Sequence, residues 1–221
     1  MDIVVFFGGI LSGFLLNVVI GKISCIVLRK RDVEKCIAIK DYKKSKKHIK
    51  VKTKNILVIL ISSILFLISF LQIGLNVIFI KAVVLNSILI VVSFIDIEYE
   101  IIPDKIIIFT FVVGVLFSFI DDISFVNAVG GMVFGGGLML ILAFVPGVLG
   151  GGDIKLMFVL GIFLGFKGTL YAMLLAFILA SIISILLLLL KIKKRKDYIP
   201  FGPFLSLGSF IAFHFINIMK F

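Results

Sequence analysis

Two aspartates, Asp96 and Asp153, stand where long apolar segments of the chain give way to polar residues. A pair of aspartates that shares one site can hydrolyse a peptide bond. The ionised carboxylate takes a proton from water, and the protonated one donates a proton to the carbonyl oxygen of the substrate. Neighbouring carboxyl groups resist ionising together, so one of them keeps its proton. We therefore predict that Asp96 and Asp153 are the catalytic pair of an aspartyl endopeptidase.

A run of three glycines, Gly150, Gly151 and Gly152, directly precedes Asp153. Glycine has no Cβ, so its backbone can lie close to another chain and can adopt angles that other residues avoid. An extended substrate strand is one such chain. We predict that the three glycines, together with Lys155 just beyond the acid, bind the substrate.

Three further acids, Glu98, Glu100 and Asp104, follow Asp96 closely. Ionisable groups at the edge of an apolar segment mark function by default, because membrane burial of charge is costly. Each also has a simpler interpretation. Glu98 and Glu100 can be solvated at the membrane interface, and Asp104, which follows a proline, can cap a helix. We include all three as candidate substrate-binding residues.

Membrane helices must position these residues, because the composition excludes an ordinary soluble domain. The chain has 221 residues, of which 62% are hydrophobic, and its mean hydropathy is +1.30. Soluble domains average about 45–50% apolar residues. We therefore predict an all-α polytopic membrane protein. Gly150 through Asp153 also resemble the Gly-x-Gly-Asp motif of intramembrane aspartyl proteases, and this resemblance implies their architecture. The net charge of +11 comes mainly from loops between apolar runs, so we expect no nucleic-acid partner.

About eight apolar segments are long enough to be considered as transmembrane helices. They lie at roughly 3–21, 55–72, 77–95, 105–120, 127–149, 155–166, 169–190 and 203–219. The sixth would extend only about 18 Å as a helix, against a hydrocarbon core of about 30 Å. The predicted organisation is a first helix over 1–21, a basic cytosolic loop over 22–54 and a seven-helix catalytic region over 55–221.

The distribution of charge predicts the orientation of these segments. Most of the 23 Lys and Arg residues fall on one side of an eight-segment topology, and that side faces the cytosol. The chain begins with Met1 and Asp2 rather than with basic residues, so we expect no cleaved signal peptide. Both termini then lie outside, the aspartates face the cytosol, and the protein lies in the plasma membrane of a prokaryote.

Three polar residues inside apolar segments have structural explanations. Asn17 can hydrogen-bond between helices. Lys81, near the outer end of its segment, can extend its ammonium to the interface. His214 is expected to be packed or hydrogen-bonded and not a ligand. The helix dipole favours an anion at a helix start, so we also predict that Asp153, which begins a helix, ionises more readily than Asp96, which ends one.

Four motifs in order resemble the type IV prepilin peptidases over nearly the whole chain. They are Asp96 through Pro103 and Asp104; Gly150 through Lys155; the small-residue stretch 9–19; and the Pro-Phe-Gly-Pro stretch within 199–208. The resemblance assigns catalysis to Asp96 and Asp153. It implies a peptidase that removes the basic leader of type IV prepilins or pseudopilins, cutting after a glycine and before an apolar helix on the cytosolic side. The acids Glu98, Glu100 and Asp104 would then attract the basic leader.

The cysteines depart from the family pattern. Many bacterial members carry two Cys-x-x-Cys pairs in the first cytosolic loop and also N-methylate the new N-terminus. This chain has only Cys25 and Cys36. We expect no cofactor or metal for the peptidase, and S-adenosylmethionine only if the chain is also a methyltransferase, which the residues leave open.

Three other functions remain as alternatives. Proteases of the presenilin and signal-peptide-peptidase kind also use Gly-x-Gly-Asp, but they place Tyr before the first aspartate, where this chain has Ile95. An ion-coupled transporter would predict acids near the bilayer midplane and an internal repeat. A structural assembly subunit would tolerate loss of both aspartates.

Overall fold

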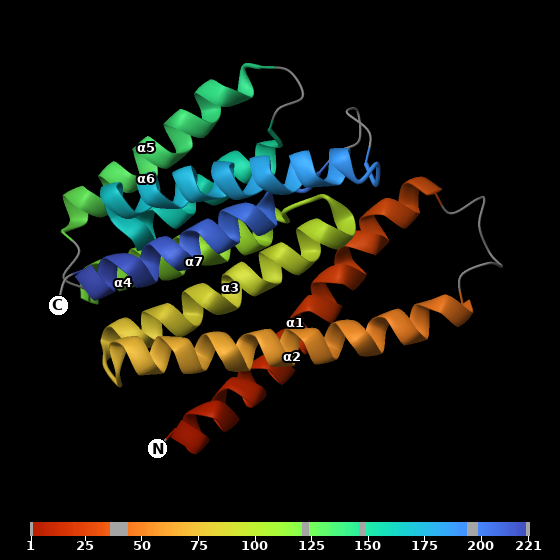
Figure 1. Cartoon of the computed structure of the whole chain (residues 1–221), viewed down its shortest axis with the longest axis horizontal. Helices are drawn as coiled ribbons and strands as arrows, with labels where there is room; N and C mark the ends of the chain where they lie inside the picture. The colour runs from red at the N-terminus through yellow and green to blue at the C-terminus, as the bar shows by residue number, and fades with distance from the viewer. Residues whose placement is uncertain (1, 36–43, 121–123, 146–148, 194–198, 220–221) are drawn as a thin grey trace. The chain divides into compact units, whose positions relative to one another are not determined.

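The computed structural model describes residues 2–35, 44–120, 124–145, 149–193 and 199–219, and the regular elements in this part of the chain are all helices (Figure 1). The helices are α1 (Asp2–Lys35), α2 (Lys44–Ile73), α3 (Val77–Tyr99), α4 (Asp104–Ile120), α5 (Phe125–Ala143), α6 (Gly151–Leu189) and α7 (Gly202–Met219). They form two compact units, Met1–Gly74 and Leu75–Phe221. The predicted all-α class is confirmed, and α2 belongs with α1 in the first unit.

The first unit is an antiparallel pair of helices in close contact. A Cβ on Gly9 would lie 2.8 Å from the Cα of Ser63, and one on Gly13 would lie 2.8 Å from the Cα of Ile59. Such small residues allow two membrane helices to approach closely. Nδ2 of Asn17 donates a hydrogen bond of 2.9 Å to the carbonyl oxygen of Asn55. This confirms the interhelical hydrogen bond expected of Asn17.

The expected loop 22–54 is helical at both ends, which corrects the sequence-based expectation. Helix α1 continues to Lys35 and α2 begins at Lys44. The apolar parts of these helices, Gly8–Val27 and Asn55–Ile73, agree with the predicted segments. Polar residues therefore extend the two helices beyond their apolar spans, and Cys36 lies outside the described residues.

In the second unit, α6 is the central element and packs against α4, α5 and α7, while α7 also packs against α3. Helix α6 is broken at Gly165, which has φ 67° and ψ −179°. A Cβ on Gly135 of α5 would lie within 3.3 Å of both Met157 and Thr169. In one straight helix these two residues would be about 18 Å apart. Helix α6 therefore turns back on itself at Gly165, as Figure 1 shows.

Two contacts hold this turn in place. The side-chain oxygen of Asn127 in α5 accepts a hydrogen bond of 2.9 Å from the backbone N–H of Phe166. A Cβ on Gly161 would overlap the backbone of Gly131, so the first arm of α6 lies directly on α5. The two arms correspond to the predicted segments 155–166 and 169–190.

Five helices within the described ranges are long and apolar enough to cross a membrane. They are Gly8–Val27, Asn55–Ile73, Val77–Tyr99, Phe125–Ala143 and Gly151–Leu189. Because the last of these doubles back, the arm before Gly165 is only about 21 Å long. The protein is a polytopic helical membrane protein, and the structure does not establish the predicted number of eight crossings.

Lys81 does not extend to the interface, which corrects another sequence-based expectation. Its side chain is buried, with 1% of its surface exposed. Its Nζ lies 6.0 Å from the ring centre of Phe163 and 5.9 Å from that of Phe213. Aromatic faces attract a cation at this range, and α6 and α7 supply them. The expectation for His214 is confirmed, since its Nδ1 donates to the carbonyl oxygen of Phe210 at 3.0 Å.

Candidate active site

Asp96 lies in the last turn of α3, and its side chain is buried. Its Oδ2 accepts a hydrogen bond of 2.8 Å from the backbone N–H of Gly202, the first residue of α7. The approach is close, because a Cβ on Gly202 would lie 2.7 Å from the same oxygen. The start of α7 therefore fixes the Asp96 carboxyl group.

Asp153 lies in the first turn of α6 and is also buried. Its Oδ2 accepts a hydrogen bond of 3.3 Å from the backbone N–H of Gly150. Its Oδ1 is buried and has no hydrogen-bond partner in the described part of the chain. A buried polar atom of this kind requires an explanation, and a substrate or a proton shared with another carboxyl group supplies one.

The two aspartates lie close enough for the Asp96 carboxyl group to act electrostatically on that of Asp153. Helices that are distant in the sequence bring them together. Two carboxyl groups in this relationship disfavour the doubly ionised state. A pair that holds one proton would supply one proton donor and one proton acceptor, as the chemistry predicted for these residues requires.

The structure removes the predicted reason for a difference between the two aspartates. Asp96 ends α3, but its carboxyl group faces the start of α7, whose N–H groups favour negative charge. Asp153 faces the start of its own helix. Both groups thus lie at a helix N-terminus, and the dipole argument no longer separates them.

The three glycines before Asp153 differ in their backbone angles and in what surrounds them. Gly150 has ordinary extended angles, φ −81° and ψ 146°, so the expectation of unusual backbone angles is wrong there. Gly152 packs on the loop before α4, where its Cβ would lie 3.1 Å from the Cβ of Ile102. Gly151 is exposed, and a Cβ there would meet nothing within 4 Å. Gly151 therefore leaves open surface at the start of α6, close to Asp153 in the sequence.

Asp104 and Lys155 form an ion pair close to this end of α6. Nζ of Lys155 lies 2.7 Å from Oδ1 of Asp104, and both side chains are more than half exposed. Helix α4 begins at Asp104 itself, while the carbonyl oxygen of Pro103 accepts the first hydrogen bond, from Ile106. Asp104 is therefore a first-turn acid rather than the cap residue.

Glu98 and Glu100 are both exposed near the end of α3. Glu100 caps the helix in a left-handed conformation, with φ 56° and ψ 34°, and its N–H donates to the carbonyl oxygen of Asp96 at 2.8 Å. Its carboxylate also lies within electrostatic range of Asp96. Glu100 is thus an exposed acid that is linked to the aspartate pair through both its backbone and its charge.

Sequence reasoning missed the role of Gly202. The stretch around it was noticed for its Pro-Phe-Gly-Pro pattern, which predicts a helix start, but nothing in that pattern indicates that its N–H reaches Asp96. Ile102, which packs on Gly152, was missed for the same reason. Both contacts arise from packing between segments that are distant in the sequence.

Fold and site together define a class, a polytopic helical membrane protein with a buried pair of aspartates at the ends of three helices. Residues 83–185 match the model of the type IV leader peptidase family. This match assigns that part of the chain, which contains Asp96, Asp104, Asp153 and Lys155, to the type IV leader peptidase family.

A curated relative agrees with the family match. The chain is 33% identical over 69 residues to a protein named prepilin leader peptidase/N-methyltransferase from Xanthomonas campestris pv. campestris. The alignment covers 31% of this chain and 24% of the relative, so the chain spans about a quarter of the length of the curated relative it matches. No solved structure matches the chain.

Proposed function

We propose that this protein is a membrane aspartyl endopeptidase that removes the basic leader peptide from type IV prepilins or pseudopilins, cutting after a glycine. The observation that carries the proposal is the buried pair of Asp96 and Asp153 within the segment that matches the leader peptidase family. The name of the curated relative, a prepilin leader peptidase, supports the substrate class.

The proposed reaction uses both carboxyl groups and one water molecule. The ionised carboxylate accepts a proton from water as the water oxygen attacks the scissile carbonyl carbon. The protonated carboxyl group donates its proton to the carbonyl oxygen, as in other aspartyl pairs. The tetrahedral intermediate then collapses. The carboxyl group that took the water proton passes it to the leaving nitrogen, the other carboxylate takes a proton back from a hydroxyl group of the intermediate, and the C–N bond breaks. The products are a new carboxyl group on the leader and a new amine on the pilin.

Protein groups would hold this pair in place for the reaction. The N–H of Gly202 fixes Oδ2 of Asp96, and the N–H of Gly150 fixes Oδ2 of Asp153. Oδ1 of Asp153 then remains for the shared proton or the substrate. Preorganised groups of this kind need little rearrangement as the transition state forms.

The charge distribution supports an orientation with the aspartates on the cytosolic side of a prokaryotic plasma membrane and both termini outside. This chemistry requires no cofactor. N-methylation of the new N-terminus would require S-adenosylmethionine as methyl donor, and mass spectrometry of the processed pilin N-terminus decides whether the chain performs it.

Co-expression with a prepilin tests the proposal. The wild-type chain should shorten the prepilin by its leader, whereas Asp96→Asn and Asp153→Asn should each abolish processing without loss of the protein from the membrane. A transporter or an assembly subunit would leave the prepilin uncut in all three cases. Processing that survives both substitutions would refute the proposed mechanism.

A further inference from the structure

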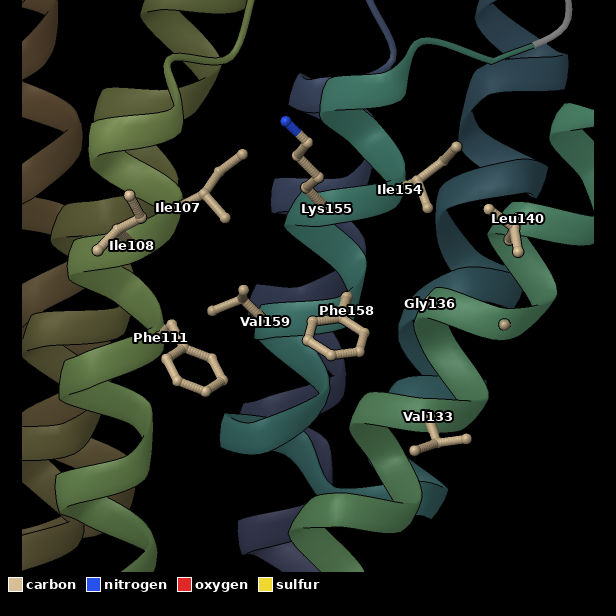
Figure 2. A pocket seen from close by; sticks show the side chains of 11 residues that line it. Ile107, Ile108, Phe111, Val133, Gly136, Leu140, Ile154, Lys155, Phe158 and Val159 are labelled. Carbon is tan, nitrogen blue, oxygen red and sulfur yellow. The ribbon is translucent and has the colours of Figure 1, made fainter.

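Helices α4, α5 and α6 line an apolar groove of about 570 Å³ (Figure 2). Its walls include Ile108 and Phe111 from α4, Val133 and Leu140 from α5, and Phe158 and Val159 from α6. Lys155, at one end, is the charged residue among its lining. The groove is therefore suited to an apolar partner with a polar or charged region at one end.

The groove is open along its side. Ile108, Val133 and Leu140 are each more than half exposed. Helices α4 and α5 both pack on α6 and meet each other at few points, which leaves the face of α6 between them uncovered. In a bilayer this opening would face other apolar chains, either lipid or a helix.

The glycines of α5 indicate a helix rather than lipid. Gly131, Gly135 and Gly136 each lie against a close neighbour from α6. Gly137 lines the groove, yet a Cβ there would meet nothing within 4 Å. Glycine weakens a helix by about 1 kcal/mol relative to alanine in water and is favoured in membranes where another helix approaches closely. Lipid chains need no such glycine, so the open Gly137 fits a helix that arrives from outside.

The groove lies next to the candidate active site along α6. Its lining begins with Ile154 and Lys155, the residues immediately after Asp153. Asp153 lies two residues before Lys155 and so faces the other side of α6, and Asp96 is close enough to act on it electrostatically. Exposed Gly151 lies one turn before Lys155 at the start of α6, with open space above it. A chain that leaves the groove can therefore cross the start of α6 at Gly151 and reach the aspartates.

We propose that this groove binds the apolar helix of the substrate, with its N-terminal end near Lys155 and the scissile segment crossing Gly151. The inference rests on the proposed function, because a pilin-type substrate supplies an apolar helix directly after the cleaved bond. An α-helix with side chains is about 10–12 Å across, so Gly137 would set how closely the substrate helix approaches. Gly137, Val133 and Phe158 then determine specificity without taking part in hydrolysis.

A matched pair of substitutions on one helix tests this. Gly137→Leu fills the groove from a position with open space, so it should not disturb the fold. Gly130→Leu makes the same change on α5 outside the groove lining, where the nearest atom to a Cβ is at 4.0 Å. Each variant of the full chain is assayed in membranes with a substrate that carries an apolar helix of about 20 residues, and with a short peptide that has the same leader and cleavage site.

The helix-bearing substrate should show a rise in KM of about tenfold or more with Gly137→Leu and little change with Gly130→Leu. Cleavage of the short peptide should be unchanged in both. An unchanged KM in Gly137→Leu, or an equal loss for both substrates, would overturn the assignment. If the wild-type chain cleaves neither substrate, the proposed function itself fails, which is a different result.

Photocrosslinking gives a second measurement that does not depend on turnover. A photoreactive phenylalanine at position 137 of the Asp153→Asn chain should crosslink to the apolar helix of the uncut substrate, and one at position 130 should not. Crosslinks from position 137 only to lipid, to a second copy of the chain or to its own α1 or α2 would refute the proposal.

Discussion

The backbone N–H of Gly202 donates a hydrogen bond of 2.8 Å to Oδ2 of Asp96 and so connects the start of α7 to the end of α3. The distance leaves no space for a side chain at position 202. A Cβ there would lie 2.7 Å from Oδ2 and 3.0 Å from Cγ of Asp96. The position of the Asp96 carboxyl group therefore depends on glycine at position 202.

We expect Gly202→Ala to lower kcat by about tenfold or more, because the added methyl group displaces the carboxylate from its position. Overpacking of this kind also costs about 1–3 kcal/mol of stability. A double-mutant cycle tests whether the clash with the Asp96 carboxylate causes this loss of stability. Gly202→Ala is made in the wild-type chain and in Asp96→Ala, and thermal melting measures the stability of each. Most of the stability cost should disappear when the carboxylate is absent. An equal cost in both backgrounds would place the clash elsewhere.

Asp153→Asn should inactivate the protein without destabilising it. The substitution preserves the shape of the side chain and removes a buried like charge beside Asp96. Active sites commonly sacrifice stability in this way. If the substitution adds about 1 kcal/mol to the free energy of unfolding, Tm rises by about 2–4 °C for a domain of this size. Melting in detergent measures it. Ser93→Ala in α3 is the comparison, because the Ser93 hydroxyl donates its hydrogen bond within its own helix, to the carbonyl oxygen of Leu89. A clear fall in Tm would contradict the argument.

The sequence alone predicts most helix positions, because long apolar runs are required of membrane helices whatever their packing. The predicted starts at 77, 105 and 203 agree with α3, α4 and α7 to within one residue. The break between the sixth and seventh segments was also expected. Its place at Gly165 could not be read from the sequence, because the amide of Asn127, on another helix, fixes it.

Contacts between helices account for what the sequence could not show. Lys81 looks like an interfacial lysine from its place in an apolar segment, but Phe163 and Phe213 from two other helices cover it. The proximity of Asp96 and Asp153 was predicted because acids are rare and costly in apolar surroundings. The contact of Asp96 with Gly202 involves a backbone N–H, which every non-proline residue has, so residue type gives no signal for it.

Asn127→Ala should destabilise the turn within α6. The side-chain oxygen of Asn127 accepts the N–H of Phe166, the first residue after the break, and loss of such a cap costs about 0.5–2 kcal/mol. Asn127→Asp keeps the acceptor and places negative charge at a helix start, so it should retain stability. Thermal melting of the two variants against wild type checks this. Equal losses for Ala and Asp would show that the hydrogen bond is not the stabilising contact.

One substitution at Glu100 should change the stability of the protein and its recognition of the leader in opposite directions. Its φ of 56° favours glycine at a helix C-terminus, and glycine there would relieve strain of about 1 kcal/mol. Yet the chain has an exposed acid at this position, close to Asp96. Asp104, by contrast, already pairs with Lys155 at 2.7 Å. We therefore expect Glu100 to attract the basic leader more strongly than Asp104 does.

Glu100→Gly should thus raise Tm while it weakens cleavage of a prepilin with a basic leader. An exposed charge pair contributes about 1 kcal/mol or less, so kcat/KM should fall by up to about fivefold. The fall should be smaller at high salt and absent for a leader whose Lys and Arg residues are replaced by Gln. Asp104→Asn is the matched control and should have the smaller effect. An equal fall for basic and neutral leaders would show that Glu100 acts on the aspartate pair and not on the leader.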